Sequence, residues 1–387
     1  MTEWLGAAET LERLGVRPQT LYAYVSRGRI EARADPADPR RSLYRAQDVA
    51  RLAARKARGR KAAVVAEEAI AWGEPVLASA ITTVADGRLY YRGRDATELA
   101  RSWTLEQAAR LLCDGYGTVV KSPAASPWGA AASPRERAFA FLARRAARDA
   151  PSRGRAPSAL ASEAASVLDG LADAVAGLSG EAVLDAPIHV RLAAAWRCDA
   201  AGADVIRRAL VLLADHELNA STFAARVAAS TGGSLAAAAL AGMAALSGPL
   251  HGGMGLRVEV FMAEARRDGA AAAVGARIAQ GLPIPGFGHP LYPRGDPRAL
   301  ALLETLKPDP LFEAVRAAAE AQTGGFANID FALTAMAAQL RLPPDAAFLL
   351  FAMGRCAGWL AHALEQISGG QLIRPRARYA GPPIRAG

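Results

Sequence analysis

Residues 281–298 read GLPIPGFGHPLYPRGDPR, a stretch that sets prolines and glycines among aromatic, histidine and arginine residues. Proline and glycine fix or free the backbone at defined points, so a loop this dense in them follows a set path. Binding and catalytic groups are concentrated on loops that a rigid scaffold positions. We therefore expect this loop to hold a site rather than only to connect two helices.

On both sides of the loop the chain is rich in alanine and has the apolar spacing of helices from about Ala62 onward. Strand signals are few. The exception is ITTVADGRLYYRG at 81–93, where two extended runs flank the hairpin pair Asp86-Gly87. Stretches rich in proline, serine and glycine at 122–134 and 150–158 predict surface loops. The sequence thus predicts an all-α fold.

One stretch has the length of a membrane span. Val227 to Leu256 carries no residue that is charged at neutral pH. Serines, glycines and a histidine interrupt it, however, and its apolar part is mostly alanine. We expect a buried helix that packs closely on another helix, and no membrane partner.

Composition limits the class of protein. The 387 residues are 52% apolar, which excludes a disordered chain, and the length favours more than one domain. The three cysteines form neither a disulfide framework nor a zinc pattern, and the N-terminus has no apolar core of a signal peptide. A reducing cytoplasm is the simplest location.

The positive charge is concentrated at the N-terminus. Residues 1–61 hold 14 Lys/Arg and 7 Asp/Glu, a net +7 of the chain's total +9. Helical spacing predicts one helix ended by Gly15 and a second that starts at Pro18, followed by the turn-rich ADPADPRRS and a third helix. We expect this module to bind an anionic partner.

The chain has five histidines, and two of them lie among glycines that let a ligand approach the backbone. These are His251 in GPLHGG and His289 in GFGHP, and both are candidates for acid–base chemistry. His216 lies in DHELNAST. For His189 and His362, an ordinary core or surface position is an adequate interpretation.

Seven blocks of sequence occur in the order of one known family. DGRLYYRGRDATELA with TLEQAARLLCDG, DHELNAST, GPLHGG, GFGHP with DPRA, NIDF, GRCAGWLAH and IRPRARYAGP resemble segments of the citrate synthase family. The resemblance covers about residue 75 to the end. It implies an almost entirely helical two-domain fold and a homodimer, with a large subdomain at about 62–253 and 337–387 and a small closing subdomain at about 254–336.

The resemblance also assigns three catalytic roles. Asp330 would remove a methyl proton from acetyl-CoA, and His251 would hydrogen-bond the thioester oxygen as the enol develops. His289 would protonate the ketone oxygen of oxaloacetate as the carbon–carbon bond forms. Because a thioester α-proton is very weakly acidic, the donor to the carbonyl oxygen must be preorganised where charge develops.

Substrate binding follows from the same resemblance. Arg298, Arg355 and Arg374 would bind the carboxylates, with Arg374 reaching across the dimer, and His216 would be a further substrate histidine. Guanidinium groups suit bidentate carboxylate binding, whereas most other arginines of the chain are surface charges. For the CoA moiety the matching positions are Arg294 and the backbone of 283–289, which includes Pro285, Gly286, Phe287 and Gly288.

The resemblance implies neither a metal nor a redox cofactor, and oxaloacetate and an acyl-CoA as partners. Met254 follows GPLHGG, and Pro290 follows His289, where the family commonly has other residues. Acetyl-CoA and propionyl-CoA therefore stay open as substrates, because one methylene adds little binding energy in a pocket.

Residues 1–61 resemble the MerR/excisionase type of winged helix-turn-helix, with VRPQTLYAYVSRG as the recognition helix. The alternative is a basic protein-contact module. The resemblance implies DNA binding, and a third hypothesis follows, in which a DNA-binding regulator senses a CoA ester or a dicarboxylate through its synthase-like part. The candidate DNA contacts are Arg17, Gln19, Thr20, Tyr22, Arg27, Arg29, Arg40 and Arg41.

Overall fold

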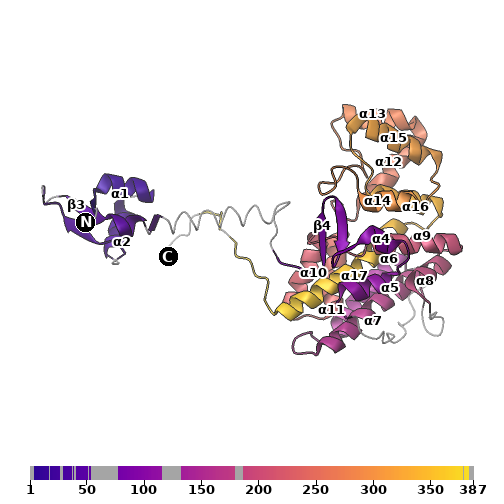
Figure 1. Ribbon diagram of the computed structural model, residues 1–387, viewed down its shortest axis with the longest axis horizontal. Coiled ribbons are helices and arrows are strands. Elements are labelled where there is room, and N and C mark those ends of the chain that lie inside the picture. The colour runs from indigo at the N-terminus through magenta and orange to yellow at the C-terminus, as the bar shows by residue number, and fades with distance from the viewer. Residues whose placement is uncertain are drawn as a thin grey trace. The chain divides into compact units, whose positions relative to one another are not determined.

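The structure, a computed structural model, divides the chain into two compact units, Met1–Ala78 and Ser79–Gly387 (Figure 1). It describes residues 4–16, 18–26, 29–36, 38, 41–50, 52–53, 77–115, 132–178, 186–377 and 379–382. The predicted contacts Arg17, Arg27 and Arg40 lie outside these ranges, as do residues 54–76 and most of the predicted loop 122–134.

The N-terminal unit combines helices with a small antiparallel sheet of order β1-β3-β2. Gly15 ends α1 in the left-handed conformation with φ 55°, and Pro18 opens α2, as the sequence predicted. The turn-rich stretch joins β2 to β3, and residues 46–50 and 52–53 are helical. The elements are β1 Trp4–Leu5, α1 Ala7–Leu14, α2 Pro18–Ser26, β2 Ala32–Ala34 and β3 Ser42–Arg45.

A small apolar core holds this unit together. Leu14 of α1 and Leu21 of α2 are buried against Tyr44 of β3 and Val49 of the following helical segment. On the outer side, Gln19 and Tyr22 of α2 are exposed and Thr20 is half-buried. Leu21 of α2 therefore faces the core, whereas Gln19 and Tyr22 face outward.

The second unit is mostly helical. Its helices are α4 Ala96–Ala100, α5 Leu105–Leu112, α6 Pro134–Arg148, α7 Pro157–Ala176, α8 Ile188–Ala195, α9 Ala200–Leu212, α10 Ala220–Ser230, α11 Leu235–Leu246, α12 Met254–Asp268, α13 Ala270–Ala279, α14 Pro297–Leu303, α15 Pro310–Thr323, α16 Ile329–Gln339 and α17 Ala346–Gly369. The one described sheet of this unit is the predicted hairpin with a short third strand, β4 Thr82–Ala85, β5 Arg88–Tyr91 and β6 Arg94–Asp95.

The helix α17 forms the centre of this unit and packs against α5, α7, α9, α10 and α11 (Figure 1). Among the described residues it is the one helix with the length and composition of a membrane span, yet nearly all of its apolar window is buried inside the protein. Such burial is typical of a core helix. Its packing is close because Gly242 of α11 leaves room for Trp359: a Cβ at Gly242 would lie 2.6 Å from the indole ring.

The uncharged stretch 227–256 is not one long helix. It comprises the end of α10, the whole of α11, the loop that carries His251 and the start of α12. The expectation of a buried helix packed closely on another helix is confirmed by α11, which packs against α10 and α17.

The helices α12, α13, α14, α15 and α16 gather at one end of the second unit (Figure 1). Within this group α12 packs on α13, α15 and α16, and α14 packs on α16. The loop that carries His289 joins α13 to α14. The predicted subdomain boundaries at 254 and 336 stay a prediction.

Candidate active site

The glycine-rich loop before α14 is bonded along its length to the segment that precedes α16. Gly288 N–H donates to the carbonyl of Phe326, and Asn328 donates from its backbone to Gly286 and from its side chain to Gly288. Asn328 also caps α16 with its side-chain oxygen. These bonds fix the position of His289 relative to Asp330, which lies in the first turn of α16.

Gly286 is required in this loop for two reasons. Its φ of 82° is a left-handed conformation that side chains disfavour. In addition, a Cβ would lie 2.9 Å from Val258 of α12 and 3.0 Å from Phe331 of α16. The close approach lets the loop pack between two helices of the group.

His289 and His216 face each other across the site. Their ring centroids are 5.2 Å apart in an edge arrangement, and Tyr292 completes the cluster through a 2.8 Å hydrogen bond between its hydroxyl and Nε2 of His216. The backbone N–H of Leu291 donates to Nδ1 of His289. The proton of a neutral His289 therefore lies on Nε2, which makes that nitrogen a hydrogen-bond donor.

His251 is held by residues of two core helices. Its Nε2 lies 2.9 Å from Oγ of Ser221 in α10, and the same Oγ accepts a 3.1 Å hydrogen bond from the indole N–H of Trp359 in α17. Ser221 has one hydroxyl proton, for which His251 and Asn219 are the two acceptors within reach. When His251 receives it, Nδ1 carries the imidazole proton.

Arg298 is buried beside a carboxylate. Its Nε and Nη2 each bond to an oxygen of Asp296, at 2.9 and 2.8 Å, and both side chains are almost fully buried. Asp296 also caps α14 and accepts the backbone N–H of Ile329 at 3.1 Å. The pair thus ties α14 to the start of α16 and places a fixed guanidinium near Tyr292.

Arg355 lies on α17 with 1% of its surface exposed. Its Nε donates to the carbonyl of Leu213 at 3.0 Å, and its guanidinium lies 5.0 Å from the ring centroid of Phe351. Nη2 is buried and has no hydrogen-bond partner among the described residues. A buried donor without a partner is costly, and this one is available to an acceptor that enters the site.

Burial keeps the three site histidines neutral. Desolvation, joined by the positive charges of Arg298 and Arg355, lowers the pKa of His251 and of His289 to about 4 and that of His216 well below its usual value. At neutral pH these rings are therefore uncharged and can donate hydrogen bonds without carrying charge into the site.

Desolvation has the opposite sign for the carboxyl group. It raises the pKa of Asp330 to about 6, against the charge of Arg298, which lowers it. Asp330 is therefore a stronger base than an ordinary aspartate and is still mostly ionised at pH 7. For Arg355, burial lowers the pKa to about 10, which leaves the guanidinium charged.

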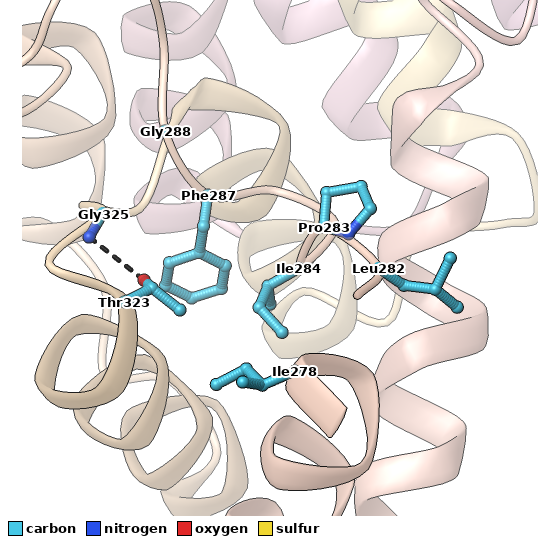
Figure 2. Close-up of a pocket in the computed structure, with 8 residues that line it drawn as sticks. All are labelled: Ile278, Leu282, Pro283, Ile284, Phe287, Gly288, Thr323 and Gly325. Carbon is cyan, nitrogen blue, oxygen red and sulfur yellow. Dashed lines mark hydrogen bonds between the residues drawn. The ribbon is translucent and has the colours of Figure 1, made fainter. Parts of the chain in front are cut away.

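The predicted CoA loop borders a mostly apolar cavity of about 260 Å³. Figure 2 shows the side chains of Ile278, Ile284 and Phe287 facing one space, with Thr323 and Gly325 at its rim. Pro285 and Gly286 are buried in the loop backbone, and Gly288 lies on the cavity wall.

Two predicted binding residues lie apart from this cluster. Arg294 and Arg374 are exposed, the latter in the segment that follows α17. The expected role of Arg374 requires a second copy of the chain and stays a prediction. In the described part of the chain, no three His, Cys, Asp or Glu side chains gather in a way that could hold a metal ion.

Several residues that shape the site are not among those predicted from the sequence. Ser221 and Trp359 fix His251, Tyr292 bonds to His216, and Asp296 fixes Arg298. Asp296 stands two residues before Arg298 in the quoted GDPR, and Ser221 stands within DHELNAST, so the neighbouring sequence could have indicated both. Trp359 and Ser221 are 138 residues apart, and no local sequence pattern indicates their contact.

A family model matches part of the second unit. Residues 184–376, which include every residue of the cluster just described, match the model of the citrate synthase C-terminal domain. This part of the chain is similar to the citrate synthase family. The resemblance is thereby confirmed for the blocks from DHELNAST onward, whereas the two blocks before residue 184 lie outside the match.

Individual citrate synthase relatives agree with this result. Citrate synthase 2 of Bacillus subtilis is 37% identical over 190 residues, which cover 46% of this chain and 51% of the relative. The 2-methylcitrate synthase 2 of Corynebacterium glutamicum is 35% identical over 189 residues, with 46% and 49% covered. The aligned part of the chain thus spans about half the length of the curated relatives it matches.

The fold extends further than the sequence match. A ternary complex of citrate synthase from Thermoplasma acidophilum with carboxymethyl coenzyme A and oxaloacetate superposes with a TM-score of 0.65 at 23% identity. The superposition covers 81% of this chain and 95% of that structure. The predicted citrate synthase fold is confirmed, whereas the helix-turn-helix identity of the N-terminal unit stays a prediction.

Proposed function

We propose that this protein condenses acetyl-CoA with oxaloacetate and water to give citrate and CoA. The observation that carries the proposal is the combination of neutral, partly buried histidines, two buried arginines and a carboxylate whose pKa is raised to about 6. Such a set can remove a weakly acidic proton and bind a dianion in the same site. The names of the relatives and of the structural neighbour support the same reaction.

The first step is enolisation of the thioester. Asp330 takes a proton from the methyl group of acetyl-CoA while Nδ1–H of His251 donates to the thioester oxygen. The developing negative charge meets a preorganised neutral donor, which stabilises the transition state. The bond of Ser221 to Nε2 of His251 supports this role because it allows the required tautomer.

The second step forms the carbon–carbon bond. The enolate carbon attacks the ketone carbon of oxaloacetate, and Nε2–H of His289 transfers its proton to the ketone oxygen as that oxygen becomes a hydroxyl. The proton that Asp330 took from the methyl group then returns through water to the ring of His289, which restores both side chains. The resulting citryl-CoA thioester is then hydrolysed by water to citrate and CoA. Holding the two reactants together supplies the proximity that a bimolecular reaction lacks.

The arginines bind the carboxylates of oxaloacetate. Arg355 offers a buried Nη2 without a partner, and Arg298 is held rigidly by Asp296. Guanidinium groups fixed in this way bind a carboxylate without first losing conformational freedom. His216 and, from a second copy of the chain, Arg374 would complete the contacts. The apolar cavity beside Phe287 would take the adenine of CoA, with Arg294 near a phosphate.

The test is release of free thiol, measured with a disulfide dye on the purified full chain. Oxaloacetate is added with acetyl-CoA or propionyl-CoA in parallel wells, and each well is matched by one without oxaloacetate. The proposal predicts oxaloacetate-dependent release with acetyl-CoA. Faster release with propionyl-CoA would make the protein a 2-methylcitrate synthase, the alternative that the Corynebacterium relative supports.

We propose DNA binding as a second function, for the N-terminal unit. The exposed Gln19 and Tyr22 on α2, and the exposed Arg29 and Arg41 around the β2–β3 hairpin, support it. Absence of thiol release together with binding of oxaloacetate and DNA would favour a regulator that senses a dicarboxylate. Absence of binding to genomic fragments at low salt would contradict the DNA-binding proposal.

A further inference from the structure

A row of buried polar side chains runs behind Arg355, outside the residues that the proposed reaction uses. Asp215 is fully buried, and its Oδ2 lies 3.2 Å from Nε2 of His362 in α17. On its other side, Nδ1 of His362 lies 3.0 Å from a guanidinium nitrogen of Arg226 in α10. Arg226 in turn pairs with Glu365, whose other oxygen accepts the backbone N–H of Ala80.

The hydrogen bonds determine the tautomer of His362. Arginine has donors and no acceptor, so Nδ1 of His362 must accept the bond from Arg226. A neutral ring then carries its proton on Nε2 and donates it to Asp215. Hydrogen bonds are thus donated in one direction along the row, from Arg226 to His362 and from His362 to the carboxylate of Asp215.

Asp215 lies in the backbone segment that holds both Arg355 and His216. The carbonyl of Leu213 accepts the Nε–H of Arg355, and the carbonyl of Ala214 accepts the backbone N–H of Gly358 at 2.9 Å. Gly358 is needed for this approach, because a Cβ there would collide with Oδ1 of Asp215. Residue 216, the next in the chain, is the site histidine.

The charge of Asp215 balances that of Arg355. Burial alone would raise the pKa of Asp215, but the hydrogen bond from His362 and the positive charge of Arg355 hold it below its usual value. Its Oδ1 has no hydrogen-bond partner among the described residues, and neither has Nη2 of Arg355. Leaving such atoms buried is costly, which is typical of a functional site rather than of a stabilising ion pair.

We propose that Asp215 and His362 are positioning residues, which hold Arg355 and His216 in the orientation that binds the dicarboxylate substrate. This inference rests on the proposed function. His362 fixes the carboxylate of Asp215, the charge of Asp215 holds the guanidinium against the positive charge of Arg298, and the segment 213–215 carries His216 with it. Neither residue touches the reacting atoms.

The test compares two substitutions of His362. His362→Leu removes both hydrogen bonds, whereas His362→Gln keeps one donor and one acceptor. We expect His362→Leu to raise KM for oxaloacetate at least tenfold and to leave KM for acetyl-CoA within about twofold. His362→Gln should recover most of the loss. His189→Leu, on α8 and away from the site, is the matched control and should leave both values unchanged.

A merely structural role would give a different pattern. If His362→Leu lowered kcat and left KM for oxaloacetate unchanged, or if His362→Gln were as impaired as His362→Leu, the proposal would be wrong. Should His362→Leu fail to fold by circular dichroism, Asp215→Asn replaces it, since this change keeps the acceptor for His362 and removes only the charge. It should raise the same KM, and an unaltered KM would overturn the proposal.

Calorimetric titration of oxaloacetate into the full chain separates this proposal from the proposed function. Weakened binding in His362→Leu but not in His189→Leu supports positioning even if the wild-type chain shows no turnover. Unchanged affinity in His362→Leu contradicts positioning even if the wild-type chain is an active synthase. A wild-type chain that neither turns over nor binds oxaloacetate overturns both.

Discussion

Two arginines at the candidate site of the second unit differ from an exposed arginine of the N-terminal unit. In the second unit Arg298 and Arg355 are 2% and 1% exposed and are fixed by Asp296 and by the carbonyl of Leu213. In the N-terminal unit, Arg41 keeps 78% of its side chain exposed and pairs loosely with Asp38 at 3.3 Å. Buried, fixed guanidinium groups select a small anion of defined geometry, whereas exposed ones meet a long polyanion through charge alone.

The difference extends to titration. Burial around the fixed arginines lowers the pKa of His251 and His289 and raises that of Asp330, so the second unit holds neutral donors and a strengthened base in one place. Chemistry on a weakly acidic carbon needs such a dry, preorganised environment, and polyanion binding does not. We therefore expect single substitutions in the second unit to change turnover or KM strongly and only at particular residues. In the N-terminal unit we expect DNA affinity to change gradually with salt concentration.

The largest expected effect is that of Asp330→Asn. The amide cannot accept the methyl proton, so turnover should fall by about 10²–10⁴. Calorimetry should still detect oxaloacetate, because the arginines remain in place. Turnover equal to that of the wild-type chain would remove Asp330 from the mechanism.

A smaller but still large effect is expected from salt on DNA binding. If the five predicted arginines each meet a phosphate, the affinity should fall by roughly several hundredfold between 50 and 200 mM salt. Arg29→Ala and Arg41→Ala should each reduce the slope of log affinity against log salt concentration by about one, without altering thiol release. A gel-shift series measures both, and an affinity independent of salt would contradict the role of these arginines.

The next effect concerns the geometry of the fixed guanidinium. Arg355→Lys keeps the charge and loses the planar fork, and we expect KM for oxaloacetate to rise roughly tenfold to a hundredfold. Arg316→Lys, where the arginine pairs with Glu313 on the outer helix α15, is the matched control and should change nothing. An equal response of the two variants would mean that the buried site does not depend on arginine geometry.

The smallest predicted effect is on stability. Folding raises the pKa of Asp330 from its usual 3.8 to about 6, so the ionised form is disfavoured in the folded state. The full shift corresponds to about 3 kcal/mol, and solvent screening of the partly exposed carboxyl reduces it. Asp330→Asn should therefore stabilise the protein by up to about 2 kcal/mol at pH 8, with the gain vanishing as the pH falls from 6 to 4. Chemical denaturation of the wild-type chain and the variant at pH 8 and at pH 4 measures this gain in the free energy of unfolding. A gain that is the same at both pH values would exclude desolvation of this carboxylate as the cause.

Local patterns in the sequence predicted local structure well. The hairpin at Asp86-Gly87, the end of α1 at Gly15 and the start of α2 at Pro18 each depend on a few neighbouring residues, and all three are observed. His251, His289, Asp330, Arg298 and Arg355 were predicted as site residues because each lies in a distinctive block, and their roles stay a prediction. The long-range pairs were not found.

The long-range side-chain pairs could not be predicted from the sequence for a physical reason. The bond between His362 and Asp215 joins residues 147 positions apart, and that between Trp359 and Ser221 joins residues 138 apart. Such pairs depend on how α17 packs against α10 and the segment after α9, which no local pattern specifies. His362 was therefore interpreted as an ordinary core or surface histidine, although it bonds to the residue that precedes His216.

The most direct test of the account is the pH profile of kcat/KM for acetyl-CoA at a fixed, low oxaloacetate concentration. With Asp330 as the base, we expect one acid limb near pH 6, where Asp330 takes up a proton. We expect a plateau from about pH 7 to 8, because the carboxylate is then at least about 90% ionised and the site histidines are already neutral. A limb near pH 4, or activity that rises through pH 7 as a histidine deprotonates, would contradict it.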